Sequence, residues 1–218
     1  MSKVLTLSKK AIYDLIISQE VSSKEIYQQK YYRPIYPGKN SGITIGLGYD
    51  VGANAPVQVQ KDWGSILPPD LITRLQKYCG KRGQICATYV PLLKDVSITW
   101  EQAVKGFYRA SLPRYARMTA SIYPELETLH PYEQTAIVGL VYNRGTDLTG
   151  DRRTEMLKLK QAIIDDNDTE MASLIRSMER LWVGQGMDGL VKRRELEAKY
   201  IAYPDTPIPE DDKLLIEI

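Results

Sequence analysis

The sequence contains a single histidine and two cysteines, and this scarcity excludes several classes of enzyme site. Zinc hydrolases usually bind their metal through several histidines or a cysteine-rich set, so no metal site is expected. His130 is also the only histidine that could activate a serine or cysteine nucleophile. It stands directly before Pro131 at the start of an expected helix, which favours a structural or capping role for this histidine.

Long apolar runs are absent as well. No stretch reaches the ~20 apolar residues of a membrane span, so no integral membrane segment is expected. Lys9, Lys10 and Asp14 interrupt the apolar positions near the N-terminus, and no signal-peptide core is present there. We therefore expect synthesis in the cytoplasm. Action in the periplasm or cell wall would require release or delivery by a secretion system.

The net charge, composition and cysteine count bear on the possible ligands, the number of domains and disulfide formation. A net charge of +2 gives no electrostatic basis for nucleic-acid binding. The 218 residues, 43% hydrophobic and 26% charged, are typical of one globular domain. The 15 tyrosines favour half-buried core and hairpin positions over a sugar-stacking surface. Cys79 and Cys86 could form a disulfide in an oxidising compartment or remain free thiols, and the sequence leaves both open.

The most informative stretch is GITIGLGYD, residues 42–50. Its isoleucines and leucine alternate with Thr44, Gly46 and Gly48, which predicts a strand with one buried face. The glycines let a ligand or another backbone come close to the opposite face. Thr44 and Asp50 are the polar groups that remain there. The segment 27–40, rich in Tyr and Pro, is expected to lead into the hairpin that this strand completes.

A helix is predicted over residues 8–19, because apolar residues recur there at helical spacing. Glu20 follows this helix, and we expect partial burial to keep its carboxyl group protonated near neutral pH. A loop is expected over 52–62. Further helices are predicted over residues 71–79, 100–112, 115–122, 131–142, 153–164, 168–179 and 187–203. Thr99 and Gln102 predict a capping box, and Pro113 predicts a break or kink.

The predicted fold class is therefore α+β, with a cleft for a ligand between two lobes. A single domain is expected over residues 1–203. Its hairpin lobe spans about 20–65, and its helical lobe spans about 66–203 together with the helix 8–19. Residues 204–218 are acidic and Pro-rich, and they are expected to form a peripheral tail.

Glu20 and Asp50 are candidates for the carboxylate pair of a glycoside hydrolase. In such enzymes one carboxylic acid protonates the leaving oxygen, and the second carboxylate activates water or attacks the sugar. Thr44, between the two in sequence, could hold the water. A chain with 27 acidic residues offers many such pairs, so the pattern alone is a weak signal.

The order Glu20, Tyr27 and TIGLGYD (residues 44–50) resembles the phage-type lysozymes of glycoside hydrolase family 24, above all their pesticin-like branch. The resemblance implies a lysozyme-like fold with Glu20 as general acid and Thr44 as a catalytic residue. Pesticin-like members place the second carboxylate after the hairpin, in "GYD", which here is Asp50. No metal or cofactor is implied. Tyr27, Gly46 and Gly48 are assigned to substrate binding.

Two downstream segments extend the resemblance. AIVGLVYNRG (136–145) is similar to the family's central helix, in which Asn143 takes the place of a polar residue that faces the cleft. LWVGQGMDGLVKRRELE (181–197) resembles the closing segment, whose first arginine lies near the acid; this is Arg193, with Arg194 as the alternative. Two features depart from the pattern, since Val21 replaces the usual glycine and Glu25 is a rival acid.

The implied activity is that of a muramidase, which cleaves the β-1,4 bond between N-acetylmuramic acid and N-acetylglucosamine. The family members are inverting enzymes, which implies a carboxylate separation of about 6.5–9.5 Å. Peptidoglycan glycan strands are then the substrate, for a phage endolysin or a delivered antibacterial toxin. A toxin would have an immunity or inhibitor protein as a further partner. The alternatives are a glycan-binding module without catalysis and an amidase or peptidase, which the single histidine disfavours.

Overall fold

A computed structural model describes residues 3–21, 23–203 and 207–218, and it shows an α+β chain that is mostly helical. The strands form two small antiparallel pairs. The chain divides into two compact units. Met1–Gln19 and Pro113–Ile218 make up one, called here the terminal unit, and Glu20–Leu112 make up the other, the middle unit. The change of lobe expected near residue 65 therefore falls inside the middle unit.

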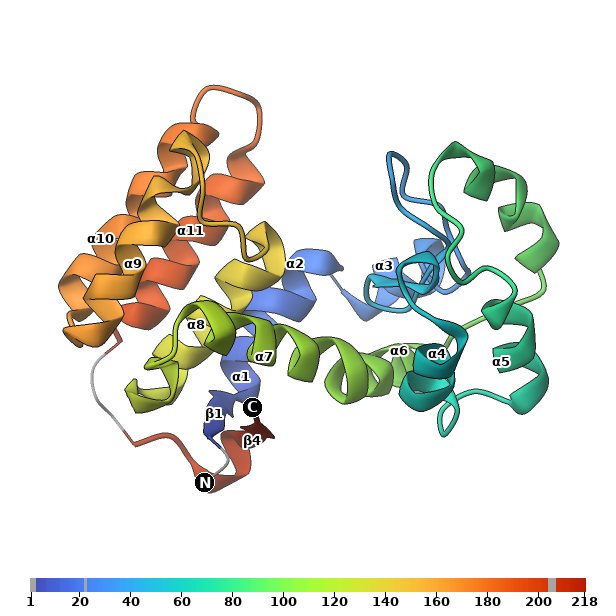
Figure 1. Cartoon of the computed structure of the whole chain (residues 1–218), viewed down its shortest axis with the longest axis horizontal. Helices are drawn as coiled ribbons and strands as arrows, with labels where there is room; N and C mark the ends of the chain where they lie inside the picture. The colour runs from blue at the N-terminus through green and yellow to red at the C-terminus, as the bar shows by residue number, and fades with distance from the viewer. Residues whose placement is uncertain (1–2, 22, 204–206) are drawn as a thin grey trace. The chain divides into compact units, whose positions relative to one another are not determined.

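In the terminal unit, the two ends of the chain pair with each other. Strand β1 (Val4–Ser8) runs antiparallel to β4 (Lys213–Glu217) (Figure 1). In this register Leu5 lies opposite Ile216. Leu5 is fully buried and Ile216 is 6% exposed. The C-terminal residues, expected to be a peripheral tail, thus end in a strand that contributes to the core.

Helix α8 (Pro131–Arg144) is the most buried helix of the terminal unit and contacts both β1 and α11. It begins as predicted, because His130 is its N-cap: the imidazole Nδ1 accepts a hydrogen bond from the Tyr132 N–H at 3.3 Å. The first helix of this unit, α1 (Lys9–Ile12), continues through a π-helical segment (Tyr13–Ile17) into α2 (Ser18–Glu20), whose last residue already belongs to the middle unit. The other α-helices that lie wholly or almost wholly in this unit are α7 (Leu112–Ile122), α8, α9 (Thr154–Ile164), α10 (Asp168–Ser177) and α11 (Asp188–Ile201).

The middle unit holds the glycine-rich stretch. Its elements are α3 (Lys24–Lys30), β2 (Thr44–Ile45), β3 (Tyr49–Asp50), α4 (Pro56–Trp63), α5 (Pro69–Gln76) and α6 (Trp100–Gly106). Residues 43–50 were expected to form one strand, but they fold back on themselves as a hairpin. The loop expected over 52–62 contains α4 instead, which starts at Pro56 and buries Trp63 in the core.

The long helical run near Pro113 is another departure. Thr99 and Gln102 form the predicted capping box of α6. The expected break at Pro113 is not found, because helix continues from α6 through a π-helical segment, Phe107–Ser111, into α7. Proline removes a backbone donor and crowds the preceding turn, and the wider π turn just before it gives the ring room.

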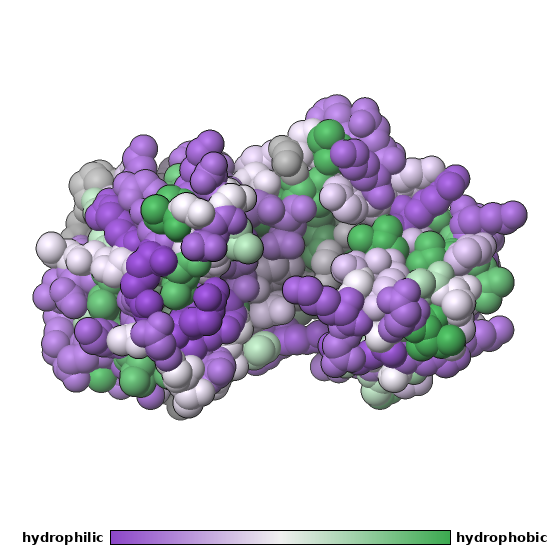
Figure 2. All heavy atoms as spheres, turned by 90° about the horizontal axis from the view of Figure 1, so that it is seen from above, coloured by the Kyte–Doolittle hydropathy of each residue, from purple (hydrophilic) through white to green (hydrophobic). Residues whose placement is uncertain are grey.

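Both cysteines are free thiols. Cys86 is buried, and burial raises the pKa of its thiol. Among the described residues no helix combines the length and apolar character needed to cross a membrane. On the face seen in Figure 2, hydrophilic side chains alternate with smaller apolar patches.

The pairing of β1 with β4 makes a prediction about stability. Ile216→Ala should lower the free energy of unfolding by about 2 kcal/mol, because it removes buried apolar contacts. Leu215 is 68% exposed on the same strand and is the matched control. Leu215→Ala should cost less than about 0.5 kcal/mol. Urea denaturation measures both, and equal losses would contradict the pairing.

A buried carboxyl group at the start of α8 makes a second prediction. Glu133 is 4% exposed, and a carboxylate oxygen of each of Glu133, Asp166 and Asp168 lies within 4.8 Å of the others. Burial, and then Asp168, raise the pKa of Glu133 to about 8. The folded state therefore holds a proton that the unfolded chain has released between pH ~4.5 and ~8, so stability falls as the pH rises through this window.

Glu133→Gln keeps an amide oxygen that can accept the hydrogen bond now donated by the His130 N–H at 2.9 Å. The variant should lose less stability than the wild type between pH 5 and pH 8, since it has no carboxyl group to ionise there. Thermal unfolding of both proteins across this range measures the difference. Parallel pH profiles would show that Glu133 does not titrate in this window.

Candidate functional site

The hairpin is shaped by its glycines. Thr44 pairs with Asp50 and Ile45 with Tyr49, which leaves residues 46–48 as the turn. Gly46 and Gly48 have φ values of +56° and +77°, a region that side chains with a Cβ rarely adopt. A Cβ on Gly46 would also lie 3.0 Å from the Trp63 ring. The glycines are therefore needed for the turn and for its packing.

The Asp50 side chain stabilises the base of this hairpin through hydrogen bonds. Both of its carboxylate oxygens accept hydrogen bonds from the Gly42 N–H at 3.1 Å, and Oδ1 accepts another from the Ala53 N–H at 3.1 Å. A guanidinium nitrogen of Arg82 lies 3.8 Å from Oδ2. The side chain is only 22% exposed. Asp50 thus joins both sides of the hairpin base and caps the short helical turn that follows.

A cavity of about 170 Å³ lies against the hairpin, within the middle unit. Of the predicted site residues, Glu20, Thr44, Gly46 and Gly48 line it. Thr44 is 8% exposed, and its hydroxyl lies 3.4 Å from the Gly42 carbonyl oxygen, a weak hydrogen bond. Glu20 is exposed, so the expected partial burial of this side chain is not found. The structure therefore brings a carboxyl group, a hydroxyl group and two glycines to one cavity.

Two predicted residues do not line this cavity. Asp50 lies at the base of the hairpin, as described above. Tyr27 is fully buried, donates a hydrogen bond from its hydroxyl to the Ile98 carbonyl at 2.9 Å, and packs edge-on against Trp100. Burial raises the pKa of Tyr27. These contacts account for Tyr27 as a core residue.

Besides Val21, which directly follows Glu20, sequence reasoning missed three residues of the wall, namely Tyr31, Ile35 and Pro37. Ile35 is held against the hairpin by two backbone hydrogen bonds with Thr44, of 3.0 and 2.8 Å. All three belong to the Tyr- and Pro-rich stretch 27–40, and that composition was the available signal. Backbone pairing with Thr44 brings this stretch beside the glycines.

Asn143 and Arg193 belong to the terminal unit. Arg193 is 4% exposed and donates to Glu197 and to the Gly139 carbonyl oxygen, both at 3.3 Å. Arg194, the alternative, is fully buried and donates to Glu197 at 2.7 Å and to the Asn143 side-chain oxygen at 3.2 Å. Burial raises the pKa of Glu197, and the two guanidinium groups oppose this shift.

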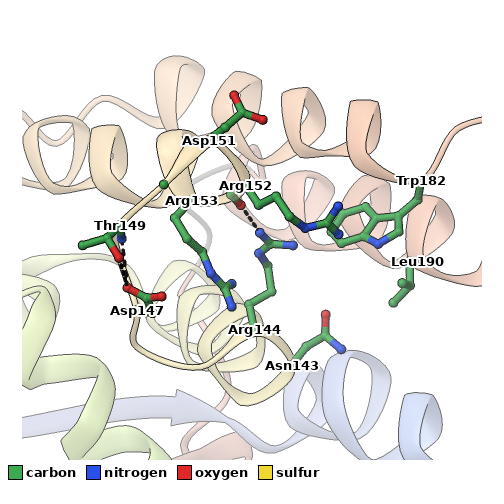
Figure 3. A pocket seen from close by; sticks show the side chains of 10 residues that line it. Asn143, Arg144, Asp147, Thr149, Asp151, Arg152, Arg153, Trp182 and Leu190 are labelled. Carbon is green, nitrogen blue, oxygen red and sulfur yellow. Dashed lines mark hydrogen bonds between the residues drawn. The ribbon is translucent and has the colours of Figure 1, made fainter.

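Asn143 lines a second, larger cavity of about 540 Å³, which lies wholly in the terminal unit (Figure 3). Its other lining residues come from the end of α8, the segment that follows it, Trp182 and Leu190. Three of these lining residues are arginines. Elsewhere in this unit, Glu133, Asp166 and Asp168 are the one group of carboxylate, histidine or cysteine side chains in the described chain whose spacing would suit a metal ion.

Comparison with known proteins adds no assignment. A scan against protein-family models finds no match to this sequence, and neither does a search of curated proteins.

The hydrogen bonds of Asp50 predict a graded effect on stability. Asp50→Ala removes the acceptor for the Gly42 and Ala53 N–H groups, and we expect a loss of about 1–2 kcal/mol of unfolding free energy. Asp50→Asn keeps an oxygen acceptor and should lose clearly less, since Asn caps helices about as well as Asp. Chemical denaturation measures both variants. An alanine variant as stable as the wild type would show that this carboxylate does not hold the hairpin.

Proposed function

We propose that this protein is a lysozyme-like glycoside hydrolase that cleaves the N-acetylmuramic acid–N-acetylglucosamine bond of peptidoglycan. One observation carries the proposal. Glu20 and Thr44, which the family resemblance assigns to catalysis, line the same cavity beside Gly46 and Gly48. These four residues are spread over 29 positions of the sequence, from residue 20 to residue 48. The middle unit nonetheless brings them together.

In this proposal Glu20 donates a proton to the leaving glycosidic oxygen. The bond then breaks with positive charge developing on the sugar, and water adds to the anomeric carbon and releases its extra proton to the solvent. The Thr44 hydroxyl can accept a hydrogen bond from that water and so hold it in place. The turn glycines carry no side chains, which would let a sugar ring lie close to the hairpin backbone.

In this proposal Asp50 contributes by holding the hairpin, and with it the Thr44 hydroxyl, in position. Its carboxylate accepts backbone hydrogen bonds from Gly42 and Ala53, and it is the cross-strand partner of Thr44. A change at Asp50 would therefore move the hydroxyl that holds the water. Asn143, Arg193, delivery as an endolysin or toxin, and an immunity protein as partner rest on the resemblance alone and remain predictions.

A glycan-binding module is the second candidate function. The exposure of Glu20 favours it, because the general acid of a glycosidase is expected to be partly buried. The position of Asp50 favours it too, since backbone hydrogen bonds hold this carboxylate at the hairpin base and it does not line the cavity. Both candidates use the same cavity, and only one of them predicts turnover.

The two candidates separate in a comparison of variants on purified peptidoglycan. Glu20→Gln should lower the rate of glycan release by at least about 100-fold, because the general acid is lost. Its binding to insoluble peptidoglycan should stay close to that of the wild type. Glu25→Gln removes an exposed acid that does not line the cavity and is the matched control.

Asp50→Asn extends this experiment. A positioning role predicts a partial loss of rate, with the inverted anomer still formed as first product. Binding of the wild type to peptidoglycan without any release of glycan would contradict the hydrolase and support the binding module. Equal rates for the wild type and Glu20→Gln would show that another group is the acid.

A further inference from the structure

The larger cavity of the terminal unit has a charge distribution that the proposed hydrolase does not use. Figure 3 shows Arg144 at the end of α8, with Arg152 and Arg153 on the segment that follows. The guanidinium groups of Arg144 and Arg153 lie next to each other, and the side chain of Arg152 extends toward Trp182. Three positive groups thus share one wall of a cavity that could hold a small molecule.

Within the described residues, these three arginines lack the ion pairs that neutralise most buried or crowded cations. In the described part of the chain, no ion pair joins Arg144, Arg152 or Arg153 to a carboxylate. Asp147 and Asp151 also line the cavity, but each already interacts with another residue. Asp151 forms an ion pair with Arg180 at 3.0 Å, and Asp147 accepts hydrogen bonds from the backbone N–H and hydroxyl of Thr149 at 2.9 and 2.7 Å.

Arg144 shows that this arrangement has an energetic cost. Burial, and then repulsion by Arg153, Arg194 and Arg152, lower the pKa of the Arg144 guanidinium to about 10. The nearby Glu155 carboxylate only partly opposes this shift of the Arg144 pKa. A half-buried cation that forms no ion pair destabilises the folded state, and a bound anion would relieve the desolvation and the repulsion together. Arg193 and Arg194 differ, because each forms an ion pair with Glu197 inside the protein.

The arginines are also held in place. Arg144 donates to the Arg152 carbonyl oxygen, directs Nε at Met156 Sδ at 3.4 Å, and stacks over the Trp182 ring at 5.0 Å. Arg153 reaches the same sulfur from its own side at 3.5 Å. Sulfur is a weak acceptor, so neither contact satisfies a guanidinium group as an oxyanion would. Because these contacts hold the arginine side chains in place before a ligand binds, less conformational entropy is lost on binding.

We propose that this cavity binds an oxyanion, a carboxylate or phosphate group of a small ligand, through Arg144, Arg152 and Arg153. The planar fork of arginine donors matches both groups and can form paired hydrogen bonds to either. The inference goes beyond the proposed hydrolase and does not depend on it. A long nucleic acid is not expected as the ligand, because the net charge of the chain is only +2.

The test titrates the full chain with inorganic phosphate and, separately, with citrate. Isothermal calorimetry follows binding at an ionic strength held constant with sodium chloride, so that general screening does not change. We expect saturable binding of at least one ion. Preference for phosphate or for citrate then tells whether the natural ligand carries a phosphate or a carboxylate.

Arg152→Gln is the main variant, because Arg152 is exposed and its replacement should not disturb the fold. It should weaken binding roughly tenfold or more, as expected for loss of charged hydrogen bonds. Arg152→Lys keeps the positive charge but loses the planar fork of guanidinium donors, so its affinity should lie between those of the wild type and Arg152→Gln. Arg117, exposed on α7 and outside the cavity, is the control. Arg117→Gln changes the net charge equally and should bind like the wild type.

Two results would overturn the proposal. One is the absence of saturable binding of either ion to a wild-type chain that is folded by circular dichroism. The other is an equal loss of binding in Arg117→Gln and Arg152→Gln, which would show a general effect of surface charge. Arg144→Gln adds a check from inside the cavity, and its folding is to be verified first because Arg144 makes several internal contacts.

Discussion

The buried Glu197 carboxylate is the interaction on which the terminal unit depends. It accepts hydrogen bonds from Arg193 and Arg194 on its own helix, α11, where none of the three side chains reaches much water. Removing such charges from water costs several kcal/mol, so the cluster is tolerable only when all its members are paired. The arginines also bond to Gly139 and Asn143 of α8, and the same charges therefore join the two helices.

A second carboxylate, Asp50, has the corresponding role in the middle unit, with backbone amides as its partners. The hairpin has two short strands and a glycine turn, and its own ladder could not fix its shape. The hydrogen bonds to Gly42 and Ala53 close its base, and the Thr44–Asp50 pair sets the position of the threonine hydroxyl. In the proposed reaction, the residue that resembles a catalytic carboxylate therefore acts by shaping the site.

The parts of the fold that could be predicted have local causes. His130 before Pro131 and the Thr99–Gln102 pair are capping signals within one turn, and the structure confirms both. The β1–β4 pair joins residues at opposite ends of the chain, and no local pattern indicates which distant partner a strand will have. The complete lining of the cavity at Glu20 likewise could not be predicted from local patterns. Glu20 and Thr44 could be proposed from a motif, but Tyr31 joins them only through tertiary packing.

The chemical nature of the ends released from peptidoglycan tests the central claim most directly. Mass spectrometry of glycan fragments, with and without borohydride reduction, identifies each new end. Hydrolysis at the proposed bond predicts N-acetylmuramic acid with a free reducing end that borohydride reduces, and uncut peptide stems. Intact glycan strands, or fragments formed only by cleavage of the stems, would contradict the claim that the cavity at Glu20 and Thr44 is a muramidase site.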